Sequence, residues 1–338
     1  MRYENVCIEG VDYVLSDEVV TSGWIEEQLD PVYQALNIAR GFIELSTGIK
    51  ERRWWDGDFM PSDGAAMVAD KLLNSRAIPK SQVQVLVNTS LTKDYMEPAT
   101  AAIIHHKIGL SSYAGSFDVT NACLGFLNGM IIVANMIELQ QIDTGLVVAA
   151  ENFAPLCKAT IDKLRGEPPS LRSFRENFVA LTTGSGAVAM LLRHKSKSAN
   201  GSKLVGGYGH SDTQHHALCV GQPNYVKTRM TELLRAGIKT LAATAEGFKK
   251  ELGWDLCMIN KVFGHQVAEK HRLLALQALG VPPGLDYPVL YNLGNIGPVS
   301  APISLALAME EGVVNHGDRI CLVGVGSGVS GLILGIEL

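Results

Sequence analysis

Two unusually apolar segments constrain the fold of this chain more than any other feature. Residues Cys123–Leu139 and Pro298–Met309 have helical periodicity, are rich in small side chains and are apolar on nearly every face. Such a helix belongs in the interior of a structure, because a surface helix keeps one polar face for water. We therefore expect two helices in the middle of the molecule, each leading to a strand that ends in a glycine-containing loop.

Short apolar runs that end in small or polar residues indicate buried strands. These runs are Val83–Asn88, Gly145–Ala150, Ala187–Leu192, Met258–Phe263 and Arg319–Gly324. Helical patterns lie between them, at Ser62–Asn74, Cys123–Leu139, Thr231–Leu252, Gln266–Leu279 and Ser300–Glu311. Near-continuous apolar strands that alternate with helices predict sheets covered on both faces. With two buried helices between two sheets, the expected α/β fold has five layers, αβαβα, built from two similar halves.

A polar stretch, Arg193–Lys203, is the best candidate for a boundary between these halves. We expect an N-terminal half of residues 1–195 and a C-terminal half of residues 203–338, packed into one body. The first half would carry a nucleophile, and the second a histidine and an asparagine.

Composition excludes several classes of protein. Hydrophobic residues make up 47% and charged residues 19% of the chain, as in a well-buried globular protein. A net charge of -5 without a basic run argues against nucleic-acid binding. Apolar stretches are interrupted well before the roughly 18 residues of a membrane span, and no signal peptide is evident. The six cysteines are scattered without a CxxC pair, so we expect no metal site and reduced thiols in a cytoplasmic protein.

One cysteine stands where a strand pattern changes into a helix pattern, within the sequence Phe117–Phe126. At a helix N-terminus, Cys123 would meet unpaired N–H groups and the positive end of the helix dipole. Both favour the thiolate, so we expect a lowered pKa and a nucleophilic thiol.

Two further segments provide partners for this thiol. His265 ends an apolar strand in Val262–Gln266, and Asn295 lies in the glycine-rich turn Gly294–Ser300, which opens the second buried helix. A cysteine, a histidine and an asparagine at such positions make a plausible acyl-transfer set.

The combination resembles the ketoacyl synthase III branch of the thiolase superfamily. The resemblance includes Ser46–Arg53, the three motifs above and the terminal Gly324–Gly328, in order along nearly the whole chain. It implies a homodimeric acyltransferase that uses coenzyme A thioesters as substrates and needs no other cofactor.

Residue roles follow from this resemblance. Cys123 would be acylated, while His265 (through Nε2) and Asn295 would hydrogen-bond the carbonyl of the second thioester as it becomes an enolate. Backbone N–H groups of Cys123 and Ser327 would form the oxyanion hole of the first acyl transfer.

The segment Asn88–Pro98 narrows the resemblance to the OleA family, which joins two long-chain acyl-CoA molecules head to head. There a glutamate at the position of Glu97 enters the partner subunit's active site and acts as base for a non-decarboxylative Claisen condensation, giving a 2-alkyl-3-oxoacyl-CoA. A decarboxylating synthase III that uses a malonyl carrier is the alternative. A degradative thiolase needs a second cysteine in the terminal glycine loop, and Cys321 precedes that loop.

Three residues concern substrate binding: two that depart from the synthase III pattern and one basic residue. The aromatic and arginine residues that often clamp the CoA adenine in synthases III are replaced by Phe42 and Ser46. Lys270 falls where a basic residue often meets phosphate or a carrier protein, so both acyl-CoA and acyl carrier protein stay open as acyl donors.

Overall fold

The computed structural model describes residues 1–55 and 58–338, and in these residues nine strands form one mixed sheet. In spatial order they are β11 (Lys261–Gly264), β12 (Arg319–Gly326), β13 (Ser330–Glu337), β8 (Lys203–Ser211), β1 (Val6–Val14), β7 (Gly186–His194), β6 (Thr144–Glu151), β4 (Val85–Asn88) and β5 (Gly115–Asp118). Strands of the first half are therefore contiguous, as are those of the second. They join where Cys7 of β1 pairs with Lys203 of β8.

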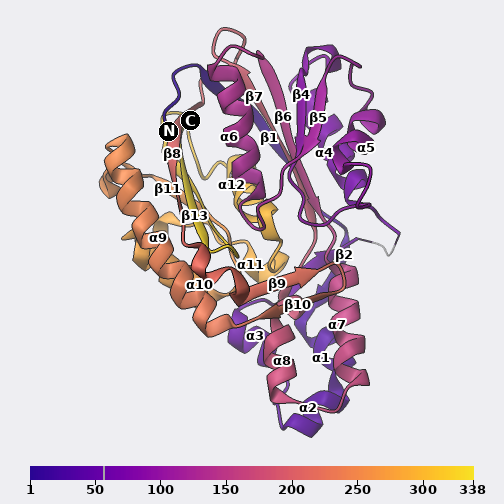
Figure 1. The fold of residues 1–338 in the computed structure, drawn as a ribbon. Coiled ribbons are helices and arrows are strands. Elements are labelled where there is room, and N and C mark those ends of the chain that lie inside the picture. Colours follow the sequence, from indigo (N-terminus) through magenta and orange to yellow (C-terminus); the bar gives the residue numbers. More distant parts are fainter. Residues whose placement is uncertain (56–57) are drawn as a thin grey trace.

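Two helices lie between the two sections of the sheet (Figure 1): α6 (Gly125–Glu138) and α12 (Ser300–Glu310). Nearly all of α12 is buried, and the Ser304 hydroxyl donates to the Ser300 carbonyl one turn earlier at 2.7 Å. A single hydrophobic cluster joins both helices to the inner faces of both sections. The apolar surface of these helices is thus explained by burial on all sides.

Other helices cover the outer faces of the sheet. They are α4 (Pro61–Ser75) and α5 (Thr100–Ile108) on the first section, and α9 (Met230–Leu252) and α10 (Glu269–Leu279) on the second. The layers are helix, sheet, helix, sheet and helix, which confirms the predicted αβαβα fold. No helix in the described ranges has the length and apolar character needed to cross a membrane.

A smaller helical region lies below the layers in Figure 1. It contains α1 (Ser22–Gln28), α2 (Asp30–Leu36), α3 (Phe42–Thr47), α7 (Ala154–Gly166) and α8 (Leu171–Asn177), with the paired strands β2 (Glu18–Thr21) and β3 (Glu51–Trp54), and β9 (Cys219–Gln222) and β10 (Tyr225–Thr228). Its own core centres on aromatic and branched side chains such as Tyr33, Trp54 and Phe174. Its strand β3 packs against the short segment Leu290–Leu293, which precedes Asn295.

Short elements complete the chain. They are α11 (Leu290–Leu293) and the 3₁₀ turns η1 (Lys80–Gln82), η2 (Phe178–Thr182), η3 (Thr213–Leu218), η4 (Leu256–Met258), η5 (Pro283–Leu285) and η6 (Gly297–Val299). Two of them, α11 and η6, frame the asparagine turn. All ten predicted strands and helices exist, with ends displaced by a few residues.

Candidate active site

Cys123 lies in a tight turn between β5 and α6. The turn is closed by hydrogen bonds from Leu124 N to the Asn121 carbonyl at 2.9 Å and from Gly125 N to the Ala122 carbonyl at 3.1 Å. Ala122 has a φ of 46°, in the left-handed region that residues with a side chain rarely occupy. Such local strain is common where a chain presents a reactive group. The helix itself begins two residues after Cys123.

The expected lowering of the Cys123 pKa is wrong. Burial, with smaller contributions from the charges of Cys219 and Glu151, raises the pKa of this thiol to about 12. Desolvation of the thiolate therefore outweighs the dipole of a helix whose first residue is Gly125. The resting nucleophile is a neutral thiol, which must lose its proton as it attacks.

His265 follows β11 and is held at both its backbone and its ring. Its N–H donates to the Val323 carbonyl of β12 at 2.9 Å, and Nδ1 donates to the Gly297 carbonyl at 3.1 Å. Burial lowers the pKa of His265 to about 3, so the ring is neutral near pH 7. Because Nδ1 carries the single ring proton, Nε2 is an acceptor in the resting state. This differs from the expected role, in which Nε2 donates.

Asn295 is buried and fixed by its own backbone. Its N–H donates to the Thr182 carbonyl at 2.9 Å, and its carbonyl accepts from Gly184 N at 3.0 Å. The side-chain oxygen accepts from Gly297 N at 3.1 Å. Within the described ranges the Asn295 Nδ2 group makes no hydrogen bond, so it remains a donor for a substrate oxygen.

Packing brings these three segments together. Leu124, next to Cys123, fills the space above Gly326 of β12, where an added Cβ would lie 3.1 Å from its side chain. Helix α6 also packs on η6, whose Gly297 bonds both His265 and Asn295. The predicted Cys, His and Asn segments thus come together at the N-terminal ends of the two central helices.

The turn with Ser327 belongs to the same place. It joins β12 to β13, and an added Cβ on the preceding Gly326 would lie 3.4 Å from the Asn121 carbonyl of the cysteine turn. Ser327 is half-buried. The two backbone N–H groups expected to form an oxyanion hole therefore come from adjoining turns, and that role stays a prediction.

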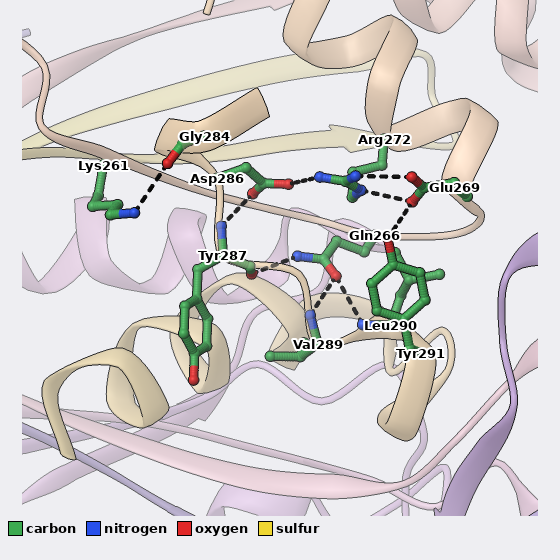
Figure 2. A network of polar contacts seen from close by, with 10 residues as sticks. All are labelled: Lys261, Gln266, Glu269, Arg272, Gly284, Asp286, Tyr287, Val289, Leu290 and Tyr291. Atoms are coloured by element: carbon green, nitrogen blue, oxygen red, sulfur yellow. Dashed lines mark hydrogen bonds and ion pairs between the residues drawn. The ribbon is translucent and has the colours of Figure 1, made fainter. Parts of the chain in front are cut away.

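A buried glutamine connects the histidine and asparagine segments (Figure 2). Gln266 donates through Nε2 to the Tyr287 carbonyl at 3.1 Å, and its Oε1 accepts from Val289 N and Leu290 N, both at 2.9 Å. Leu290 begins α11, which leads directly to the Asn295 turn. One side chain, adjacent to His265 in sequence, therefore fixes the approach of the chain to Asn295.

Ion pairs also stabilise the segments next to Gln266. Arg272 binds Glu269 through two nitrogens at 2.8 and 2.9 Å and Asp286 at 2.6 Å, while Tyr291 donates to Glu269 at 2.8 Å (Figure 2). An added Cβ on Gly48 would lie 3.3 Å from both Glu269 and Tyr291. The Ser46–Arg53 motif therefore packs against Glu269 and Tyr291, which belong to this network beside the site.

Glu97 lies elsewhere on the protomer. It occupies the loop between β4 and α5 and is exposed, as are Tyr95 and the fully exposed Met96. The protomer therefore does not bury this carboxyl in its own site.

The structure also shows where the residues expected near the CoA nucleotide lie. Phe42 packs on Phe178 and Phe174, with ring centroids 5.5 and 6.1 Å apart, so its ring belongs to the core of the helical region. Ser46 is exposed and donates to the Phe42 carbonyl at 2.6 Å. Lys270 is exposed on α10 and lines a shallow groove of about 690 Å³ with Arg235 and Lys239 of α9.

Sequence reasoning missed two polar residues of this region, Gln266 and Glu151. Gln266 stood in the histidine motif but was given no role, and Glu151 is a charge at the end of an otherwise apolar strand. A charged residue ending a fully buried strand is the signal that could have singled out Glu151, because such groups need a specific partner. Glu151 is fully buried.

A cysteine turn before a buried helix, with histidine and asparagine on facing loops in an αβαβα fold, defines a thiolase-like condensing enzyme. Residues 117–212 match the family model of 3-oxoacyl-[acyl-carrier-protein (ACP)] synthase III, and residues 250–336 match the model of its C-terminal region. The chain therefore belongs to the ketoacyl synthase III family of thiolase-like acyltransferases.

Particular relatives resemble the chain over its whole length. The acyl-CoA:acyl-CoA alkyltransferase of Shewanella oneidensis is 36% identical, with 100% of both chains covered. That of Xanthomonas campestris is also 36% identical over 98% of both chains. A cerulenin-bound crystal structure of Xanthomonas campestris OleA superimposes with a TM-score of 0.98 at 35% identity, covering 100% of this chain and 98% of that one.

Other structures of Xanthomonas campestris OleA carry replacements of one glutamate, one cysteine or one histidine. The separations between these three positions along that protein equal those between Glu97, Cys123 and His265 here. A cysteine-to-serine variant of the same protein contains bound lauric acid and lauroyl-CoA.

Proposed function

We propose that this protein condenses two long-chain acyl-CoA molecules head to head, without decarboxylation, to a 2-alkyl-3-oxoacyl-CoA. The observation that carries the proposal is the convergence of Cys123, His265 and Asn295, combined with Glu97 on an exposed loop. The full-length likeness to acyl-CoA:acyl-CoA alkyltransferases supports the same reaction.

In the first half-reaction the Cys123 sulfur attacks the carbonyl carbon of one acyl-CoA. The S–H bond breaks, the proton passes to Nε2 of His265, and the tetrahedral oxyanion is held by backbone N–H groups of Cys123 and Ser327. The C–S bond to CoA then breaks, the CoA sulfur takes the proton, and an acyl-cysteine remains. A lone pair on Nε2, fixed by the Nδ1 bond to Gly297, suits this transfer.

In the second half-reaction a base removes a proton from the carbon next to the carbonyl of a second acyl-CoA. No CO₂ leaves to generate the carbanion, so a base is required, and Glu97 of the partner subunit serves as that base. The enolate oxygen is held by Nδ2 of Asn295, and by His265 when its Nε2 carries a proton. The carbanion attacks the carbonyl carbon of the acyl-cysteine, the C–S bond to Cys123 breaks, and the departing thiolate takes up the proton that Glu97 removed.

A homodimer is part of this proposal. Strand β5 is the last strand of the sheet, and an unpaired edge can pair with a second chain. Tyr95 and Met96, next to Glu97, expose 55% and 100% of their surface, as interface residues do in an isolated protomer. These features support a Glu97 that enters the neighbouring site.

Three positively charged side chains line one groove: Lys270, Arg235 and Lys239. We propose that this groove binds the phosphates of CoA, in place of the clamp that Phe42 and Ser46 do not supply. An acyl carrier protein, which is acidic, would be the competing occupant. A cytoplasmic location, the absence of a cofactor, and the halves 1–195 and 203–338 remain predictions.

Incubation with a long-chain acyl-CoA alone tests the reaction. We expect free CoA and a 2-alkyl-3-oxoacyl product by mass spectrometry, without any malonyl donor. Product that forms only with a malonyl carrier would contradict the proposal and favour the decarboxylating alternative.

Variants separate the two steps of the reaction. Cys123→Ala should abolish the acyl adduct and the product, whereas Glu97→Gln should keep the adduct and lose the product. A Glu97→Gln enzyme with full condensing activity would remove Glu97 from the mechanism.

A further inference from the structure

Glu151 ends β6 and has no charged partner among the described residues, and burial raises the pKa of its carboxyl to about 8. Its carboxylate is fully buried and accepts from Leu91 N at 2.6 Å, from Thr92 N at 2.9 Å and from the Thr92 hydroxyl at 2.8 Å. Within the described ranges it forms no ion pair. A buried carboxylate is costly, so three donors from one short segment make that segment its specific partner.

The segment held in this way is the root of the loop that carries Glu97. From Leu91 and Thr92 the chain continues outward to the exposed residues Tyr95 and Met96, and then to Glu97. Further bonds fix this root to β6: Ala150 N donates to the Ser90 hydroxyl at 2.9 Å. The exposed part of the loop therefore starts from a rigid base.

The same root also touches the cysteine turn. An added Cβ on Gly125, two residues after Cys123, would lie 2.7 Å from the Thr89 carbonyl. The charge of Glu151 is near enough to Cys123 to raise the pKa of that thiol. Glu151 thus holds a segment that contacts the cysteine turn at Thr89 and continues into the loop of Glu97.

We propose that Glu151 is a positioning residue: by binding Leu91 and Thr92 it sets the path of the loop that delivers Glu97 to the partner subunit's active site. This inference rests on the proposed function. Its distinctive consequence is that Glu151 acts on condensation in the other protomer, through a loop, and not on acylation of its own cysteine.

The first experiment separates acylation from condensation. In homodimers, Glu151→Gln keeps the size of the side chain but replaces one acceptor oxygen with a donor group. We expect no loss of acyl-Cys123 formation, because removing the charge of Glu151 does not raise the pKa of that thiol, and roughly a tenfold or greater loss of condensation, the effect of losing a buried hydrogen bond. Equal loss of both steps, or of neither, would overturn the inference.

A matched pair of variants guards against misfolding of Glu151→Gln. Thr92→Val removes the hydroxyl that donates to Glu151 at 2.8 Å and accepts from Asn152 N at 3.1 Å, whereas Thr92→Ser retains it. We expect Thr92→Val to lower condensation in the same selective way and Thr92→Ser to restore it. Thermal unfolding of each variant shows whether the fold is intact.

The second experiment uses heterodimers in which one protomer carries Cys123→Ala, so that only its partner can be acylated. Glu151→Gln placed on the protomer with Cys123→Ala should lower condensation, and placed on the acylated protomer it should not. Glu97→Gln, tested in the same two arrangements, gives the reference pattern. A loss that follows the acylated protomer would overturn the inference, because Glu151 would then act on its own site.

Failure of the proposed function gives a different result. If the unmodified dimer makes no condensation product from acyl-CoA alone, the reaction itself is wrong and this inference falls with it. If the unmodified dimer condenses and Glu151→Gln condenses equally well, only the role of Glu151 is wrong.

Discussion

His265 donates a hydrogen bond from Nδ1 to the carbonyl oxygen of Gly297 at 3.1 Å, and this contact fixes which ring nitrogen is free. Gly297 also donates its N–H to the side-chain oxygen of Asn295 at 3.1 Å. One glycine therefore orients both residues that we propose to hold the substrate carbonyl. The contact leaves a proton acceptor at Nε2 of His265 and a proton donor at Nδ2 of Asn295.

Gln266→Met tests the connection between the two catalytic loops. The change keeps the volume of the side chain and removes all three of its hydrogen bonds, so the Asn295 turn loses its support from the His265 segment. We expect the condensation rate to fall roughly tenfold to a hundredfold, because small displacements of positioning groups have effects of that size. Mass spectrometry should still find the acyl-Cys123 adduct. Gln266→Glu, which can still accept from Val289 and Leu290, is the intermediate control.

Alkylation of Cys123 should report its raised pKa. Because burial raises this pKa to about 12, the thiolate fraction should increase with pH throughout the accessible range. The rate of iodoacetamide labelling at Cys123 should therefore rise about tenfold per pH unit from about pH 7 to about pH 10. Peptide mass spectrometry resolves this site from the other cysteines. A plateau near neutral pH would mean that the helix dipole prevails after all.

Gly125→Ala should disturb the cysteine turn. An added Cβ would lie 2.7 Å from the Thr89 carbonyl, which is backbone and cannot easily move aside. We expect a loss of about 1–3 kcal/mol in the free energy of unfolding, together with slower acylation of Cys123. Gly166→Ala is the matched control, since nothing lies within 4 Å of its added Cβ. Chemical denaturation of the two variants makes the comparison, and equal stability would contradict the contact.

His265 should also make the fold sensitive to acid. Its pKa is lowered from 6.5 to about 3, so below about pH 6.5 the unfolded chain binds a proton that the folded chain does not. The contribution of His265 to the free energy of unfolding is therefore complete above about pH 6.5. It falls by up to about 1.4 kcal/mol per pH unit as the pH drops toward 3. His265→Asn should lose less stability between about pH 7 and about pH 5 than the unmodified protein. Parallel losses in both proteins would argue against a buried neutral ring.

The central part of the fold could be predicted because burial leaves a clear pattern in the sequence. Helices α6 and α12 are apolar on nearly every face, and strands such as β6 and β7 are continuous apolar runs. Strand β13 was missed because the short turn at Ser327 merges it with β12 into one apolar stretch. Strand β1 was missed because Glu9 and Asp12 interrupt its pattern, although Glu9 is buried and bonded to the Ser198 hydroxyl at 2.6 Å.

The candidate site was partly predictable for a related reason. Cys123, His265 and Asn295 stand at the ends of buried elements, and the ends of neighbouring strands and helices meet in space. The ionisation of Cys123 could not be predicted, because desolvation depends on how segments far apart in the sequence surround the thiol. The tautomer of His265 depends on Gly297, 32 residues away along the chain. The proposed role of Glu97 needs a second chain, which no single sequence pattern describes.

The exposed position of Glu97 has a consequence for how the activity depends on protein concentration. In the proposed mechanism, the Glu97 carboxyl of one protomer contributes nothing to turnover until a second protomer accepts it. Specific activity should then decline on dilution below the dissociation constant of the pair, by mass action. Acylation of Cys123, which needs no residue from a second protomer, should continue at the same dilution. An acyl-enzyme that does not go on to condensation should then accumulate.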